Sequence, residues 1–175
     1  MCDIALGVNR DKKCTNSLGG NSELYLYNYL DDAFTVVDGI ATAVNAGLTT
    51  VYKYVIEGDG NTLDQSMLGD DKVGTRVNTQ TLVAQLKKID GATSNELNKL
   101  AAGQISGVIK DRNGVYQALA LDDGFFSKTI NPVSGGAKVD FNGYNVTLVG
   151  ETSALAPTLD SATATAFLAL YTPTP

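Results

Sequence analysis

The 175-residue sequence contains no histidine and no tryptophan, only two cysteines and four prolines. Without histidine, neither a Ser-His-Asp triad nor a His-ligated metal site can form. Cys2 and Cys14 are the only thiols, two ligands too few for tetrahedral zinc. In a reducing compartment we expect both thiols to stay free rather than to form a disulfide. These absences exclude the commonest nucleophilic and zinc-dependent enzyme classes.

Positive charge and long apolar runs are also scarce. The net charge of −6 and the pI of about 4.5 argue against a surface that grips nucleic acid by counterion release. No apolar run approaches the ~20 residues of a membrane span, and residues 1–13 lack the apolar core of a secretory signal. We therefore expect one domain of ordinary size, made in the cytoplasm and not inserted in a membrane.

Strand-like segments dominate what is present. The segments 23–30, 34–37, 51–58 and 79–89 are rich in Tyr, Leu and Val or alternate between apolar and polar residues. In the last of them, Leu82, Ala84 and Leu86 fall on one face. The stretch 39–50 is ambiguous between a turn and an irregular strand. The pattern predicts a mainly β fold.

One short flanking helix is expected over residues 93–103. Thr93 and Glu96 have the spacing of a capping box, and Gly103 is a helix-ending residue. The Thr- and Ala-rich end of the chain contains a further apolar segment, 165–171. We interpret that segment as an edge strand or as a contact to a neighbouring chain.

Three segments carry too little apolar content to fold alone: an extended N-terminal arm (1–22), a long loop (58–78) and a C-terminal extension (158–175). Contacts with other chains could order them. The loop is acidic through Asp59, Asp64, Asp70 and Asp71, and we interpret it as mobile or partner-binding.

Two Asn-Gly steps, each preceded by an aspartate, raise the question of calcium binding. An EF-hand loop needs oxygen ligands at positions 1, 3 and 5 and glycine at position 6. Counting from Asp111, these last two positions are Val115 and Tyr116. Counting from Asp140, they are Tyr144 and Asn145. The spacing excludes a calcium loop of this kind at both places.

Both steps instead favour two-residue hairpin turns, which need positive φ at both central residues. With Asn142 and Gly143 at the turn, apolar pairs fall on one face and polar pairs on the other; the apolar pairs are Phe141–Tyr144, Val139–Val146 and Ala137–Leu148. With Asn113 and Gly114 at the turn, the expected pairs run from Arg112–Val115 to Val108–Leu119.

No other pattern indicates catalysis. The Gly-rich segment 58–64 lacks the Lys-Ser/Thr of a phosphate loop, and Ser66 and Ser134 have no histidine to activate them. The eight tyrosines could form a sugar-stacking platform, but core or interface positions are commoner for strand tyrosines. We therefore predict no catalytic residue, no cofactor and no metal.

The order of several weak motifs resembles the tail tube proteins of tailed bacteriophages, particularly those infecting Bacteroidetes hosts. The resemblance covers about residues 14–157. The segments that carry it are "TSNELNKLAAG", "KDRNG", and "FNGYNVTLVGE" followed by "APTLD". Residues 158–175 lie outside it.

This resemblance implies a β-sandwich or barrel flanked by one helix, and a structural virion protein rather than an enzyme. Six copies would pair their sheets into a ring with a continuous inner barrel, and stacked rings would form a tube for genome ejection. Long loops would reach to the next ring, and as a hypothesis we assign the acids of the loop 58–78 to that contact: Asp59, Asp64, Asp70 and Asp71. Partners would be further copies, other tail proteins and possibly a sheath, with DNA passing through without specific binding. An acidic bore would keep DNA from sticking. The alternatives are another β-type virion protein (capsid decoration, baseplate or hub) and a carbohydrate-binding module.

Overall fold

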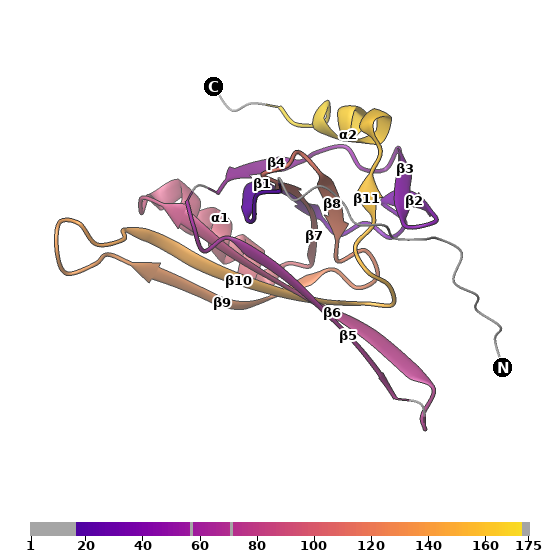
Figure 1. Ribbon diagram of the computed structural model, residues 1–175. Helices are drawn as coiled ribbons and strands as arrows, with labels where there is room; N and C mark the ends of the chain where they lie inside the picture. Colours follow the sequence, from indigo (N-terminus) through magenta and orange to yellow (C-terminus); the bar gives the residue numbers. More distant parts are fainter. Residues whose placement is uncertain (1–16, 57, 71, 173–175) are drawn as a thin grey trace.

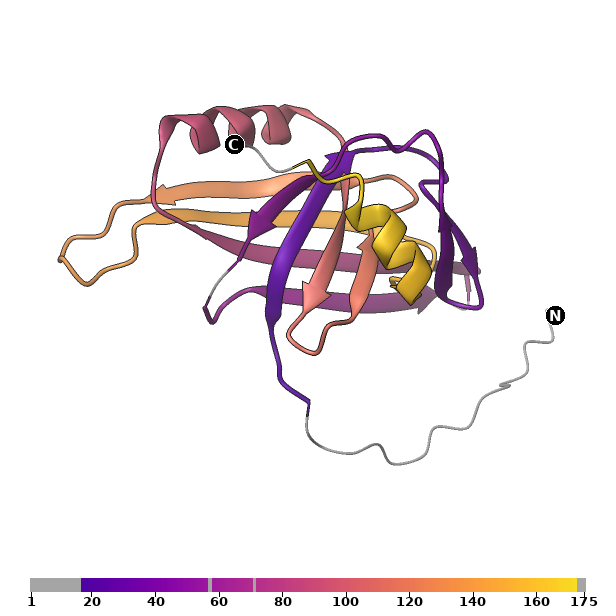
Figure 2. The same ribbon diagram turned by 90° about the horizontal axis from the view of Figure 1, so that it is seen from above.

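The computed structural model describes residues 17–56, 58–70 and 72–172, whose strands form one mixed sheet that folds over into two layers and does not close (Figures 1 and 2). The mainly β, sandwich-like fold expected from the sequence is confirmed.

The first layer, which we call the packed sheet, has the order β4-β1-β7-β8-β11-β3-β2. In chain order its strands are β1 (Asn21–Asn28), β2 (Phe34–Val37), β3 (Ile40–Val44), β4 (Tyr52–Val55), β7 (Ile105–Asp111), β8 (Tyr116–Leu119) and β11 (Thr158–Leu159).

The second layer, the open sheet, has the order β9-β10-β6-β5. Its strands are β5 (Thr62–Asp70), β6 (Thr75–Lys87), β9 (Phe125–Val133) and β10 (Gly143–Thr152). The pair Ile105–Phe125 joins β7 to β9 and links the two layers.

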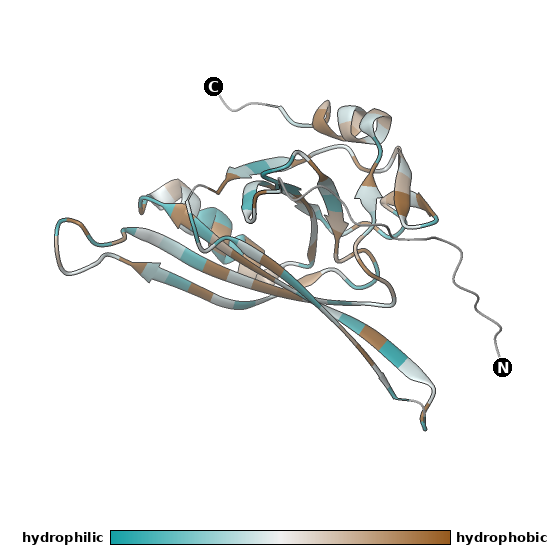
Figure 3. Cartoon of the chain, viewed as in Figure 1, coloured by the Kyte–Doolittle hydropathy of each residue, from teal (hydrophilic) through white to brown (hydrophobic). Residues whose placement is uncertain are grey.

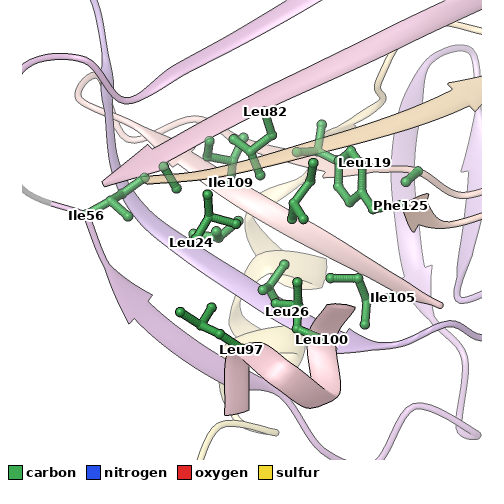
Figure 4. Packing of buried hydrophobic residues seen from close by; sticks show 14 of the residues in the cluster. Leu24, Leu26, Ile56, Leu82, Leu97, Leu100, Ile105, Ile109, Leu119 and Phe125 are labelled. Atoms are coloured by element: carbon green, nitrogen blue, oxygen red, sulfur yellow. The ribbon is translucent and has the colours of Figure 1, made fainter. Parts of the chain in front are cut away.

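The main core lies between the layers (Figure 4). Leu24 and Leu26 from the packed sheet meet Leu82 and Leu148 from the open sheet, and all four are buried. The predicted inward face of the segment 79–89 is therefore confirmed for Leu82 and Ala84, with Leu86 only partly buried.

Helix α1 (Gly91–Ala102) lies over this core through Leu97 and Leu100. The helix is confirmed, but its predicted cap is wrong. Asp90 is the N-cap, and its carboxylate accepts hydrogen bonds from the Thr93 backbone N–H at 2.8 Å and the Thr93 hydroxyl at 2.7 Å. An aspartate immediately before Gly91 offers an acceptor one turn earlier than the Thr93–Glu96 box.

The outer side of the packed sheet carries a second, aromatic cluster. Phe167 is completely buried there and packs edge-on against Tyr25 and Tyr27, with ring centroids 5.8 and 6.2 Å apart. Phe167 belongs to a second helix, α2 (Ser161–Leu168), whose N-cap is Asp160. The predictions of a single helix and of an edge strand over 165–171 are therefore wrong, and residues 158–172 are part of the core rather than an extension.

The predicted long loop 58–78 is also wrong, because most of it forms the hairpin β5–β6. The register runs from Thr62–Val83 to Asp70–Thr75. Gly74, with φ of +71°, supplies the left-handed residue of the turn. Leu63 and Gln65 face the core and alternate with Thr62 and Asp64, which face outward. This weak strand pattern is difficult to recognise in the sequence because Gly and Asp residues lie on either side of it.

The hairpin at Asn113-Gly114 exists, but its register differs by one residue from the prediction. Lys110 pairs with Tyr116 and Val108 with Ala118. The turn has three residues, because the Asp111 carboxylate accepts from the N–H groups of Asn113 and Val115, both at 2.8 Å. Gly114 takes the left-handed position with φ of +85°.

The predicted turn at Asn142-Gly143 is wrong. β10 begins at Gly143, which pairs with Lys87 on one side and Val133 on the other. A Cβ at this glycine would lie 2.1 Å from the Leu86 carbonyl oxygen, so close strand approach rather than a turn requires glycine here. Asn142 accepts from the backbone N–H of Lys88, through its carbonyl, and of Ile89, through its side chain.

The remaining expectations for strands are confirmed near the predicted positions, and the ambiguous stretch 39–50 contains β3. The predicted N-terminal arm ends earlier than expected, since β1 begins at Asn21. Its residues 1–16, including Cys2 and Cys14, lie outside the described residues. Leu18 is held by Asn113, whose side chain bonds both the N–H and the carbonyl of Leu18 at 2.9 and 2.8 Å.

Candidate assembly surface

The described residues contain no group of three His, Cys, Asp or Glu side chains placed to hold a metal ion. A hollow of about 480 Å³ is lined by carboxylates and apolar side chains, among them Asp31, Asp32, Phe34 and Asp122. Over the same part of the chain, no helix has both the length and the apolar character needed to cross a membrane.

The acids assigned to the 58–78 segment do not gather at one place. Asp59 is exposed and lies 3.4 Å from the Arg112 guanidinium. Asp64 lies on β5, while Asp70 ends that strand and accepts from the Lys72 N–H at 2.8 Å. Asp71 lies outside the described residues. These side chains therefore share a hairpin but not a site.

The tyrosines that suggested a sugar platform are divided between core and surface. Tyr25 and Tyr27 are buried in the aromatic cluster. Tyr52 is 52% exposed, and Tyr54 is partly buried against the main core. The first pair is unavailable to a ligand, which removes most of the expected aromatic surface.

Four strands leave an outer edge wholly or largely unpaired within the described residues, and they fall into two classes. In the packed sheet, the edge strands β2 and β4 have four residues each, and Tyr171 bridges to Val51 next to β4. In the open sheet, the edge strands β5 and β9 have nine residues each. Short edges are a common protection against unwanted pairing, whereas long ones present a template for another strand.

Most side chains of the two long edge strands are exposed. Seven of the nine residues of β5 and five of the nine of β9 are exposed. Their charges are complementary: β5 carries Asp64 and Asp70 and no base, and β9 carries Lys128 and no acid. A strand bulge lies on β9, because Thr147 pairs with Thr129 but Leu148 pairs with Ser127, which leaves Lys128 as the extra residue.

The face of the open sheet that points away from the core is covered by nothing in the described chain, and none of its side chains is fully buried. Hydroxyl and amide groups dominate this uncovered face. From β5 to β9 its members are Thr62, Asp64, Ser66, Thr79, Thr81, Val83, Gln85, Lys87, Asn145, Thr147, Val149, Glu151, Phe126, Lys128, Thr129 and Asn131. Two acids balance two bases, so the negative net charge of the chain is not concentrated here.

The far end of the hairpin β5–β6 projects from the body as a two-stranded arm (Figure 1). We define the arm as residues 67–77, since β10 pairs with β6 only as far as the pair Thr152–Asn78. Leu68 and Val73 are 63% and 70% exposed on it, and hydrophobic and hydrophilic residues are mixed along it (Figure 3). A two-stranded hairpin without a packed face is only marginally stable in water, so the arm is suited to a contact with another molecule.

A buried polar network anchors the arm where it leaves the body. Gln80 accepts from the Ala120 N–H at 2.8 Å and donates to the Thr152 hydroxyl at 3.3 Å. The Asn78 side chain donates to the Ala154 backbone carbonyl at 2.9 Å. The side-chain Oε1 of Gln65 accepts from the Ala156 N–H, also at 2.9 Å. Because these groups are shielded from water, their bonds fix the direction of β5 and β6 relative to the core.

No protein-family model matches the chain, and neither a curated protein nor a solved structure matches it.

Proposed function

We propose that this protein is a structural subunit that assembles with copies of itself into rings and that the rings stack into a tube, as in a phage tail tube. The observation that carries the proposal is the open sheet, whose two nine-residue edge strands are complementary in charge and unpaired on their outer sides apart from the pair Phe125–Ile105. Different surfaces at the two ends of one sheet make a head-to-tail contact, which closes into a ring if the rotation allows.

Ring closure would remove both long edges at once. Six copies of the four-stranded open sheet would give a barrel of about 24 strands, roughly 45 Å across between opposing backbones. Barrels of about 16 to 18 strands already enclose an aqueous channel. The packed sheet and both helices lie on the other side of the open sheet, so its uncovered face would line the bore.

The chemistry of that face suits passage rather than binding. DNA is held mainly through phosphate contacts with Lys and Arg, and this face has only Lys87 and Lys128, offset by Asp64 and Glu151. A nearly neutral surface of hydroxyl and amide groups gives phosphates little to hold. DNA would then slide with low friction because the charges on this face balance. The acidic bore expected from the sequence is not needed to keep DNA from sticking.

The arm would supply the contact between rings. Its exposed Leu68 and Val73 would be buried against the next ring, which is a better account of the segment than the acidic contact first assigned to it. The other virion roles, a hub or a capsid decoration, would require rings that do not stack.

Negative-stain electron microscopy of the purified chain tests the proposal. We expect rings or hollow filaments at high protein concentration. Rings that never stack would favour a hub or decoration role over a tube. A chain that stays monomeric at millimolar concentration would overturn the proposal.

A matched pair of variants tests the role of the edge. Ser66 on β5 is opposite Thr79 on β6, and both lie on the uncovered face. Ser66→Lys places a charge at the outer edge, whereas Thr79→Lys places the same charge one strand further in. We expect Ser66→Lys to prevent ring formation and Thr79→Lys to permit it, with both monomers folded. Equal assembly of the two variants would remove the β5 edge from the interface.

A further inference from the structure

The strand directions of the open sheet determine how two copies meet. Each strand is antiparallel to its neighbour, so β5 runs opposite to β9. In a ring made by rotation, β9 of the next copy keeps the direction of β9 in the first. It therefore approaches β5 antiparallel, and an antiparallel ladder can continue from copy to copy.

The two long edges are offset along the strand direction. Thr62, Val83, Thr147 and Thr129 form one row across the four strands. From this row, β9 continues four residues to Val133, away from the arm, while β5 continues eight residues toward the arm, to Asp70. If two copies met with Thr62 opposite Thr129, about half of each edge would stay unpaired.

Side-chain alternation restricts the shift between copies to an even number of residues. An odd shift would place core-facing residues of one copy beside exposed residues of the next. A shift of four sets Thr62 opposite Val133 and, because the bulge leaves Lys128 out of the ladder, Leu68 opposite Phe126. Phe125 already pairs with Ile105 on this side of β9, so the free part of the β9 edge is 126–133. A shift of four gives this whole part, apart from the bulged residue, a partner on β5, whereas a shift of two leaves the end at Val133 unpaired.

The tilt of strands in a closed barrel gives the same answer independently. A shift of four residues over four strands is one residue per strand, so the shear equals the strand number whatever the number of copies. That ratio corresponds to a tilt of about 36°, within the usual range of roughly 35–45°. A shift of two residues would give a tilt of only about 20° and a shift of six a tilt of about 48°, both outside that range.

We propose that β5 of one copy pairs with β9 of the next in the register that sets Asp64 opposite Asn131 and Ser66 opposite Thr129. This inference rests on the proposed function, since it describes the contact that closes the ring. Lys128, the extra residue of the bulge, then lies beside the strand that carries Asp64 and Asp70. Pro132 has no N–H group to donate, which is tolerated at a sheet edge and affects the ladder only near one end.

Paired cysteines test the register. In a background with Cys2→Ser and Cys14→Ser, the variant Asp64→Cys, Asn131→Cys places two thiols opposite each other across the contact. Within one copy these positions are three strand spacings apart, about 14 Å, too far for a disulfide. The controls combine Asp64→Cys with Thr129→Cys or with Val133→Cys, which match slips of two residues in either direction.

On oxidation of assembled material, we expect the Asp64–Asn131 variant to form a ladder of covalent oligomers several-fold more efficiently than either control. Assemblies in which a control pair cross-links more strongly would overturn the register while leaving the ring intact. If the unmodified chain forms no ring or tube in the microscope, the proposed function itself fails.

Hydrogen exchange on the unmodified chain gives a second measurement that needs no substitution. Backbone amides in residues 62–66 and 129–133 should exchange at least about tenfold more slowly in assemblies than in monomers. Unchanged exchange at both edges in assembled material would contradict the pairing, even if the cysteine variants fail to assemble.

Discussion

The two sheets of this protein differ in how far the chain completes them. The packed sheet ends in four-residue edge strands and is covered by α2 and the aromatic cluster. The open sheet ends in nine-residue strands, has one uncovered face and extends into the arm. The same chain thus finishes one layer with its own residues and leaves the other exposed.

The comparison separates residues that stabilise the monomer from residues available for contacts. Substitutions in the packed half should change the free energy of unfolding. Substitutions on the open edges and uncovered face should change assembly with little effect on folding. The predictions below test this division, and each compares a residue in one environment with a similar residue in the other.

The largest effect is expected for two phenylalanines in opposite environments. Phe167 is 0% exposed in the aromatic cluster, and Phe126 is 60% exposed on the uncovered face. Phe167→Ala should lower the free energy of unfolding by about 3–5 kcal/mol, whereas Phe126→Ala should change it by about 0.5 kcal/mol or less. Urea denaturation of the monomers measures both. Similar losses in the two variants would contradict the division.

Two glutamines of β6 should show the next largest difference. Gln80 is 1% exposed and accepts the Ala120 N–H, while Gln85 lies on the uncovered face. Gln80→Leu leaves that buried N–H without an acceptor and should cost about 1–3 kcal/mol. Gln85→Leu should be nearly neutral in the same denaturation experiment. A neutral Gln80→Leu would mean that the network does not anchor the arm.

A smaller effect is expected from acid, through Glu23 on β1. Burial alone would raise the pKa of its carboxyl, but hydrogen bonds from Lys53, Tyr25 and Lys110 outweigh burial and lower the pKa below the ordinary 4.5. The stabilisation that the Glu23 carboxylate gives the folded state is therefore present above pH 4.5 and is lost as pH falls through the lowered pKa.

The variant Glu23→Gln should lose about 1 kcal/mol at pH 7 and show a shallower fall in stability below pH 4.5. Unfolding free energies at pH 7 and pH 3.5 for both proteins provide the measurement. The same acid sensitivity in variant and unmodified chain would exclude Glu23 as its source.

The smallest effect on folding should come from removing the end of the arm. Replacing residues 68–77 by Asn-Gly joins Met67 to Asn78, which already face each other, through a two-residue turn. The monomer should keep its stability within about 0.5 kcal/mol, and rings should form without stacking. Long tubes from this variant, seen in the microscope, would exclude the arm from the contact between rings.

Local patterns in the sequence predicted those elements whose signals are local. The alternation of Leu82 and Ala84 identified β6, and Gly103 identified the end of α1. Asn113-Gly114 identified a hairpin but not its register, because the Asp111 carboxylate adds a third residue to the turn.

The predictions from sequence are wrong where contacts between residues far apart in the chain determine the structure. Asn142-Gly143 has the composition of a tight turn, yet Gly143 is needed for close approach to Leu86 across the sheet. In α2, alternating Thr and Ala conceal a helix that is stabilised by burial of Phe167. The unpaired edges could not be predicted at all, because they depend on the order of strands from distant parts of the chain.

The single arm on each subunit also gives any assembly a direction. Rotation about a common axis carries every arm to the same rim, so one rim of a ring would carry a circle of projections and the other would not. A long stack in which every arm meets the same surface of the next ring must be head to tail, and the growing structure would have two chemically different ends. A partner that recognises one end would therefore be unable to cap the other.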